Sequence, residues 1–173
     1  MKKIVLMITL LFLGILSAEY SVEGAKGVYS NKANTFNTEI EYLKDSDEFQ
    51  IKFKGKSDGW IAVGFGQTNK MKDGEIYMGY IDGDEVVFEH HYGTSPVSHS
   101  KVKEKENTYK LVSSSKENGY LEFVFKRPAV LDEKYFHKMN PGEEIDFMYA
   151  VGPEPNFKVV HKEKGKSKIT LPK

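Results

Sequence analysis

Large apolar residues fall on every second position in several short runs of this chain, and this pattern constrains the fold most. Residues 49–53 read Phe-Gln-Ile-Lys-Phe, and residues 121–125 read Leu-Glu-Phe-Val-Phe. Because the pattern repeats every two residues, alternate side chains point to opposite faces of a strand. This is typical of strands buried on one face in antiparallel sheets. Residues 60–65 are apolar throughout and predict a central strand instead.

Turn-forming residues separate these runs at intervals of about ten residues. Asp82-Gly83-Asp84 predicts a tight hairpin between residues 76–81 and 85–91. Counted from Thr35, the pattern predicts about nine strands, together with one short helix over residues 132–138 that Asp132 would cap. The expected fold is therefore an all-β antiparallel β-sandwich.

The first 18 residues read as a secretory signal peptide, which leaves residues 19–173 as a single domain. Two lysines precede an apolar run from Ile4 to Leu16, and Ser17-Ala18 supplies a small-residue cleavage site. A retained membrane anchor is the alternative, but as a helix this run would cover only about 20 Å of a core about 30 Å thick. We expect a periplasmic or extracellular protein with no membrane span in the mature chain.

The charge balance and the absence of cysteine exclude several classes of function. Lys+Arg and Asp+Glu both number 25, so there is no basic surplus for binding nucleic acid. Without cysteine the chain forms no disulfide, thiolate metal site or covalently attached c-type haem. The lysine-rich residues 158–173 predict a solvated edge strand, with a positive patch for an acidic partner as the alternative.

No motif in the chain predicts catalysis. There is no nucleophile elbow, zinc-protease motif or phosphate-binding glycine loop. Glu89-His90-His91 suggests a metal site at first, but His90 and His91 would point to opposite faces of a strand. Glu89 and His91 share a face without an evident third ligand. We therefore expect the chain not to be an enzyme by itself.

Two residues have a functional interpretation beside a structural one. Met71 lies in a polar loop, either packed against the sandwich or serving as a thioether ligand to haem iron. His161 precedes the lysine-rich segment, either as a partly exposed histidine or as a second axial ligand. Trp60 and its aromatic neighbours could line a pocket for a sugar ring or a porphyrin.

The order of these segments resembles the DOMON domain, a family named for the N-terminal region of dopamine β-monooxygenase. The resemblance spans Thr35 to Leu171, nearly all of the mature chain. It is carried by Gly59–Gly66, Met71, Asp73–Tyr80, Leu121–Pro128 with Arg127, Asp132, Met148–Gly152 and His161–Gly165. The resemblance implies an Ig-like β-sandwich that binds either b-type haem or a sugar.

Haem-binding members of that family, such as the cytochrome domain of cellobiose dehydrogenase, use a Met and a His as axial ligands. The resemblance therefore implies non-covalent haem b held by Met71 and His161, lined by Trp60, with Arg127 or lysines near His161 pairing with the propionates. The haem-binding subunit of ethylbenzene dehydrogenase uses Met with Lys, which leaves Lys162 as an alternative to His161.

The implied function is a secreted or periplasmic electron-transfer module that exchanges electrons with a separate redox partner protein, or with an oxidoreductase of which it is a subunit. A haem-free module that binds a sugar or another small ligand is the alternative. A third reading is a protein-interaction domain without a small ligand.

Overall fold

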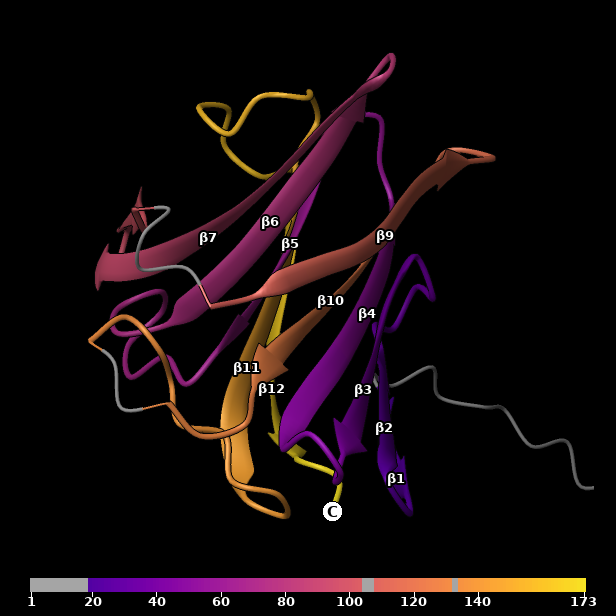
Figure 1. Ribbon diagram of the computed structural model, residues 1–173. Helices are drawn as coiled ribbons and strands as arrows, with labels where there is room; N and C mark the ends of the chain where they lie inside the picture. Colours follow the sequence, from indigo (N-terminus) through magenta and orange to yellow (C-terminus); the bar gives the residue numbers. More distant parts are fainter. Residues whose placement is uncertain (1–18, 104–107, 132–133) are drawn as a thin grey trace, which may run out of the picture.

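A computed structural model describes residues 19–103, 108–131 and 134–173, which form two six-stranded antiparallel sheets (Figure 1). The first sheet has the order β1 (Glu19–Glu23), β2 (Lys26–Ser30), β3 (Phe36–Leu43), β4 (Glu48–Lys56), β10 (Tyr120–Pro128) and β9 (Lys110–Glu117). The second sheet has the order β12 (Glu163–Thr170), β11 (Glu144–Val151), β5 (Trp60–Phe65), β6 (Glu75–Asp82), β7 (Glu85–Ser95) and β8 (Ser98–Lys101).

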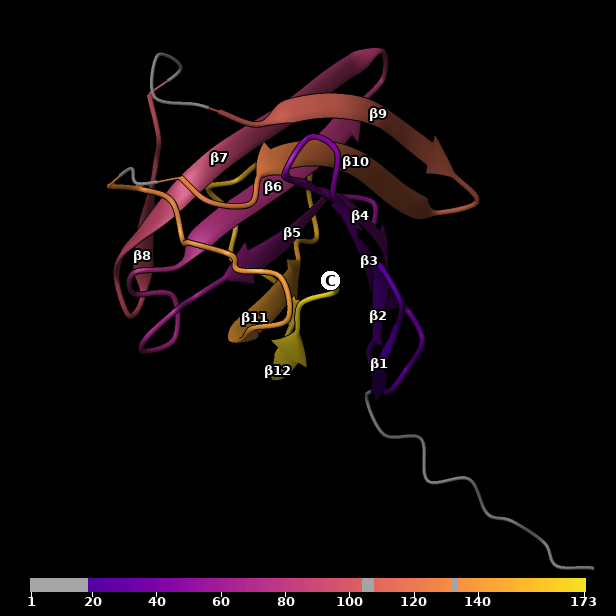
Figure 2. The same ribbon diagram turned by 60° about the horizontal axis from the view of Figure 1, so that its bottom comes forward.

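The two sheets pack face to face and confirm the predicted β-sandwich (Figure 2). The alternating runs form β4 and β10, which pair with Phe53 opposite Phe123. Both rings are fully buried and stack with their centroids 5.6 Å apart. Burial of such aromatic rings is a major source of the stability of a sandwich core without disulfides.

The apolar run at residues 60–65 forms β5, which lies inside the second sheet between β11 and β6. All six of its residues are buried. Ile61, Val63 and Phe65 belong to the main core between the sheets, whereas Trp60 and Ala62 belong to a separate cluster. Because neighbours along a strand point to opposite faces, that cluster lies on the face of the second sheet turned away from the first. We call this face the outer face.

The hairpin and edge-strand predictions are also confirmed. β6 and β7 are joined by Gly83-Asp84, with Asp82 opposite Glu85 and Gly83 at a φ of 57°. The lysine-rich segment forms β12, which is the edge of its sheet. Lysine on an edge strand discourages pairing with another chain.

The described residues form twelve strands rather than about nine. β1 and β2 precede Thr35, where the predicted strands begin; each has five residues, β1 is mostly exposed, and β2 buries Gly27 and Tyr29. Tyr29 is the one large apolar side chain that the two strands bury, so neither shows the run of alternating apolar residues that identified β4 and β10. They form a hairpin that extends the first sheet beside β3.

The predicted helix over residues 132–138 is wrong for the part that the structure describes, since residues 134–135 form a turn and residues 136–138 have no regular secondary structure. The main-chain groups of His137 are used by other partners. Its amide donates to Glu75 Oε2 over 2.9 Å, and its carbonyl accepts from Arg127 Nη2 over 2.9 Å. A helix would need such groups for its own hydrogen bonds. Asp132 and the proposed signal peptide lie outside the described residues.

Within the described ranges, no helix has the length and apolar character needed to cross a membrane.

Candidate functional site

The outer face of the second sheet carries a second apolar cluster, although a two-layer sandwich requires only one apolar face per sheet. Trp60, Ala62, Ile76 and Met78 form its buried part. The half-buried residues packed against it are Met71, Tyr80, Met148, Ala150 and Phe157. We call these nine residues the outer-face cluster. A concentrated apolar surface outside the main core is typical of a binding site.

Residues 152–162, the gold loop between β11 and β12 in Figure 1, contribute Phe157 to this cluster. The Phe157 ring lies 4.9 Å from the Tyr80 ring and 6.4 Å from the Trp60 ring, between centroids. Trp60 also holds the segment through its main chain and its indole. Its carbonyl accepts from the Gly152 amide over 2.7 Å, and its Nε1 donates to the Val159 carbonyl over 3.2 Å.

Met71 lies in the β5–β6 loop and is half-buried against the outer-face cluster. The loop is fixed by its own turn and by β7. The Gly74 amide donates to the Met71 carbonyl over 3.0 Å, and the Asp73 amide donates to the Gly93 carbonyl over 2.9 Å. The Gly93 amide in turn donates to the Gly74 carbonyl over 2.9 Å. Backbone bonds therefore determine where the Met71 thioether can lie.

His161 lies at the end of the 152–162 segment, two residues before β12 begins. Its side chain is half-buried, whereas that of Lys162 is exposed. The Lys162 amide donates to the Val151 carbonyl over 2.8 Å, which ties this point of the segment to the end of β11. Both residues precede the strand, so strand alternation does not fix their directions.

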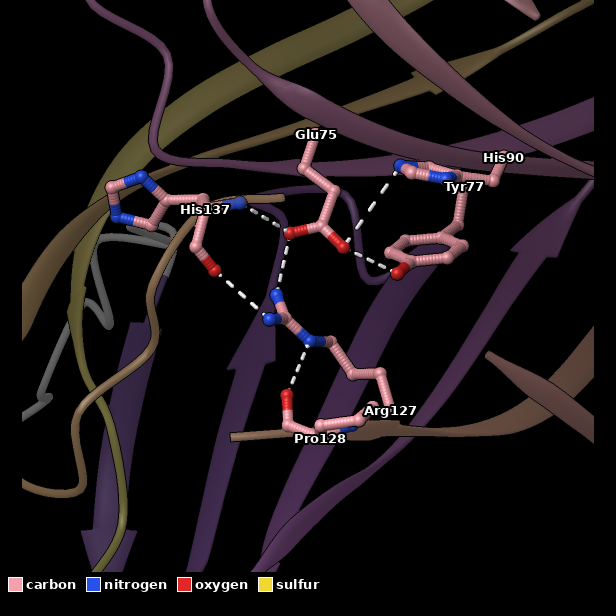
Figure 3. Close-up of polar contacts among 6 residues, drawn as sticks. All are labelled: Glu75, Tyr77, His90, Arg127, Pro128 and His137. Carbon is pink, nitrogen blue, oxygen red and sulfur yellow. Dashed lines mark hydrogen bonds and ion pairs between the residues drawn. The ribbon is translucent and has the colours of Figure 1, made fainter. Parts of the chain in front are cut away.

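Arg127 does not lie on the outer face with Trp60 and Met71. Its side chain is fully buried inside the sandwich, and Nη1 lies 2.5 Å from Glu75 Oε2 (Figure 3). Glu75 alternates with Ile76 along β6, so it points away from the outer face. We expected Arg127 or lysines near His161 to pair with haem propionates; the Arg127 guanidinium pairs with a carboxylate of its own chain.

The Glu75–Arg127 pair is surrounded by hydrogen bonds that satisfy both charges. Glu75 accepts from the Tyr77 hydroxyl and the His137 amide, while Arg127 Nε donates to the Pro128 carbonyl over 2.9 Å. Burial raises the pKa of Glu75, and the Arg127 guanidinium opposes this shift. Burial likewise raises the pKa of Tyr77 well above its usual value, so the phenol stays protonated and donates.

Burial lowers the pKa of three histidines below 6.5: His91, His99 and His137. The nearby Arg127 guanidinium lowers the pKa of His137 further. The folded state therefore binds fewer protons than the unfolded chain once the pH drops to about 6.5. The stability that these histidines contribute is fully present above that pH and is lost as the pH falls towards their folded-state pKa values.

Replacing His137 with Asn should consequently reduce the loss of stability between pH 7.5 and pH 5.5. Urea midpoints are compared between the wild type and the variant at both pH values, because the contribution of Glu75 is present in both proteins. That contribution has the opposite sign, since an acid with a raised pKa adds stability as it becomes protonated. Equal changes of midpoint in the two proteins would contradict a lowered pKa at His137.

Several residues of the site were not identified from the sequence. Ile76, Met78 and Met148 occupy strand positions that look like ordinary core, and Phe157 lies in a loop without periodicity. Glu75 carries the one usable signal, since it is a charged residue at the start of a strongly apolar strand. Such a residue predicts a buried partner but does not identify it.

Comparison with known proteins gives a family profile and two similar solved structures. The profile of the DOMON domain matches residues 32–152. The cytochrome domain of Myriococcum thermophilum cellobiose dehydrogenase has a TM-score of 0.63 at 12% identity, over 90% of this chain and 89% of that one. The cytochrome b domain of pyranose dehydrogenase from Coprinopsis cinerea has a TM-score of 0.57 at 16% identity, over 78% and 82%.

No sequence among the curated proteins matches this chain. At the identities of the two solved structures, the likeness establishes a shared fold.

Proposed function

This chain belongs to the DOMON domain family, and on that premise we propose that it binds haem b non-covalently and transfers electrons, with Met71 and His161 as axial ligands. The similar solved structures, a cytochrome domain and a cytochrome b domain, support the choice of haem over a sugar. The chain itself is then an electron-transfer partner or a subunit of an oxidoreductase rather than the enzyme.

The outer-face cluster is the observation that carries this proposal. A planar apolar macrocycle needs an apolar surface with aromatic side chains, and Trp60, Tyr80 and Phe157 provide these on a sheet face that would otherwise be polar. The residues present therefore fit a porphyrin. The described residues contain no group of three or more His, Cys, Asp or Glu side chains arranged for a metal.

Met71 and His161 belong to the two segments that reach the outer face from opposite ends of β5. The Met71 loop follows Phe65, whereas the segment that ends at His161 is held by Trp60. Haem iron with Met and His ligands changes oxidation state by one electron, and this pair raises the reduction potential. His161 is the better second ligand than Lys162, since the exposed lysine would have to lose its proton first.

The lysines near His161 are the other expected partners of the propionates, and β12 carries several of them. In the β11–β12 register, Lys164 lies opposite Ala150 and Lys166 opposite Met148. Paired residues share a face, so both lysines lie along the edge of the outer face. They place positive charge beside the apolar surface, and the charge itself stays exposed to solvent.

The test is an absorption spectrum of the purified protein titrated with haem, oxidised and then reduced with dithionite. We expect one haem per chain and narrow α and β bands on reduction, as for a six-coordinate low-spin iron. Met71→Leu and His161→Ala should each lose the low-spin spectrum. Met148→Leu, a methionine of the same cluster, should keep it.

A low-spin spectrum that survives in the Met71 or His161 variant would overturn the ligand assignment. Absence of stoichiometric haem uptake would overturn the haem proposal and favour the haem-free module, whose ligand a glycan screen would then seek. We further propose that the protein works in the periplasm or outside the cell, where its redox partner must also be.

A further inference from the structure

Four polar side chains form a continuous series of contacts on the outer face where β7 meets β8. Lys101 Nζ lies 2.7 Å from Glu89 Oε1, and Glu89 Oε2 lies 2.8 Å from His91 Nε2. His91 Nδ1 then lies 3.0 Å from His99 Nδ1. We propose that His91 and His99 form a binding site for a divalent transition-metal ion of the Cu(II) or Ni(II) type, with Glu89 orienting His91. This proposal does not rest on haem binding.

The β7–β8 register explains why these residues meet. His91 is paired with Lys101 across the two strands, and His99 is paired with Gly93. Glu89 and His91 are two residues apart on β7, as are His99 and Lys101 on β8, so all four side chains share one face. The sequence showed Glu89 and His91 on one face, but His99 joins them only through strand pairing.

The hydrogen bonds fix which nitrogen of His91 is available. Its Nε2 can donate to the Glu89 carboxylate, whose pKa is kept low by hydrogen bonds from Lys101 and His91 against the effect of its burial. The lone pair of His91 Nδ1 then accepts from His99 Nδ1. A carboxylate that holds the second nitrogen of a histidine is the usual arrangement around a metal ligand.

A metal ion bound by both rings would displace the proton between the two Nδ1 atoms and would lie to one side of the line that joins them. His99 then carries its proton on Nε2, so both imidazoles stay neutral and no proton is released. His91 is 7% exposed, and the half-buried His99 leaves room for water as the remaining ligands.

The separation of the two nitrogens indicates the kind of metal. With metal–nitrogen bonds of about 2.0–2.1 Å, a tetrahedral centre would hold its nitrogens about 3.3 Å apart. The observed 3.0 Å is that of a hydrogen bond; if it were kept on metal binding, the angle at the metal would be about 94°, close to the right angle of a tetragonal site. Tetragonal nitrogen and oxygen coordination is characteristic of Cu(II) and Ni(II).

The experiment titrates the haem-free full chain, without a histidine tag, with Cu(II) and separately with Ni(II). Calorimetry should show one ion per chain, and the Cu(II) paramagnetic resonance spectrum should be tetragonal with coupling to two imidazole nitrogens. His99→Asn should weaken binding at least about ten-fold, and Glu89→Gln should weaken it about 10–100-fold. His99 lies on a short edge strand, so its variant should remain folded, and circular dichroism checks this.

His161→Asn is the matched control, because it removes a half-buried histidine of the proposed haem site and should leave metal binding unchanged. Unchanged affinity in folded His99→Asn would overturn the proposal, as would a Cu(II) spectrum with fewer than two imidazoles. Loss of metal binding in His161→Asn would place the metal at the proposed haem site and would also overturn the proposal. None of these outcomes depends on whether the protein takes up haem.

Discussion

Replacing Arg127 with methionine is expected to lower the free energy of unfolding by about 3–5 kcal/mol, since it leaves a buried charge without its partner. Both side chains of the Glu75–Arg127 pair are fully buried, with Nη1 2.5 Å from Oε2. Methionine has a comparable length and fills much of the same space, so the loss reports charge more than volume. Urea unfolding of the two proteins at pH 7 measures the difference.

Two controls separate the buried charge from other effects of the Arg127→Met change. Lys168→Met makes the same kind of change at an exposed ion pair, where Nζ lies 3.1 Å from Glu144 Oε1, and should alter stability little. Adding Glu75→Gln to Arg127→Met should recover part of the loss, because Gln is neutral. Its amide oxygen can accept from the His137 amide while its amide nitrogen donates to the Tyr77 hydroxyl, which can also act as an acceptor.

The pH dependence gives a further signature of the unpaired carboxylate. Without the opposing guanidinium, burial raises the pKa of Glu75 further, so the Arg127→Met variant should recover stability as the pH falls and Glu75 becomes protonated. A loss that is the same at pH 7 and pH 5, and that Glu75→Gln does not relieve, would show that packing rather than charge governs this position.

The sandwich could be predicted from the sequence because its core strands are buried on one face. Alternation identified β4 and β10, and uniform apolarity identified β5 as central. The strands that were not predicted, β1 and β2, bury one large apolar side chain between them, Tyr29, so their sequences contain no run of alternating apolar residues. The segment at residues 134–138 was wrongly predicted as a helix for a different reason. Its main chain is bound by Glu75 and Arg127, which are 52 residues apart, and no local pattern encodes such a contact.

The candidate site was only partly predictable for the same physical reason. Met71, His161 and Trp60 stand out locally, and they remain predicted site residues. What surrounds them depends on long-range placement: Phe157 reaches Tyr80 from a loop, and His99 reaches His91 through strand pairing. The sequence of β5 predicts burial on both faces, but it does not say which segment covers the outer one.

Replacing Gly93 with alanine is expected to displace the Met71 loop and to lower the free energy of unfolding by at least about 2 kcal/mol. A Cβ at Gly93 would overlap the carbonyl oxygen of Met71, and backbone cannot move aside as a flexible side chain can. The same glycine exchanges two backbone hydrogen bonds with Asp73 and Gly74. The added methyl group therefore pushes directly on the residue proposed to bind iron.

The ε-methyl resonances of the methionines report this displacement without any ligand. In Gly93→Ala the Met71 methyl signal should shift, whereas that of Met139, fully buried in the main core, should stay in place. Gly83→Ala is the control: it has a positive φ of 57° and nothing near its Cβ, so it should cost only the backbone strain of about 1–2 kcal/mol. An unshifted Met71 signal in a stable Gly93→Ala protein would mean that β7 does not position the thioether, because the loop would then hold Met71 in place without the close approach at Gly93.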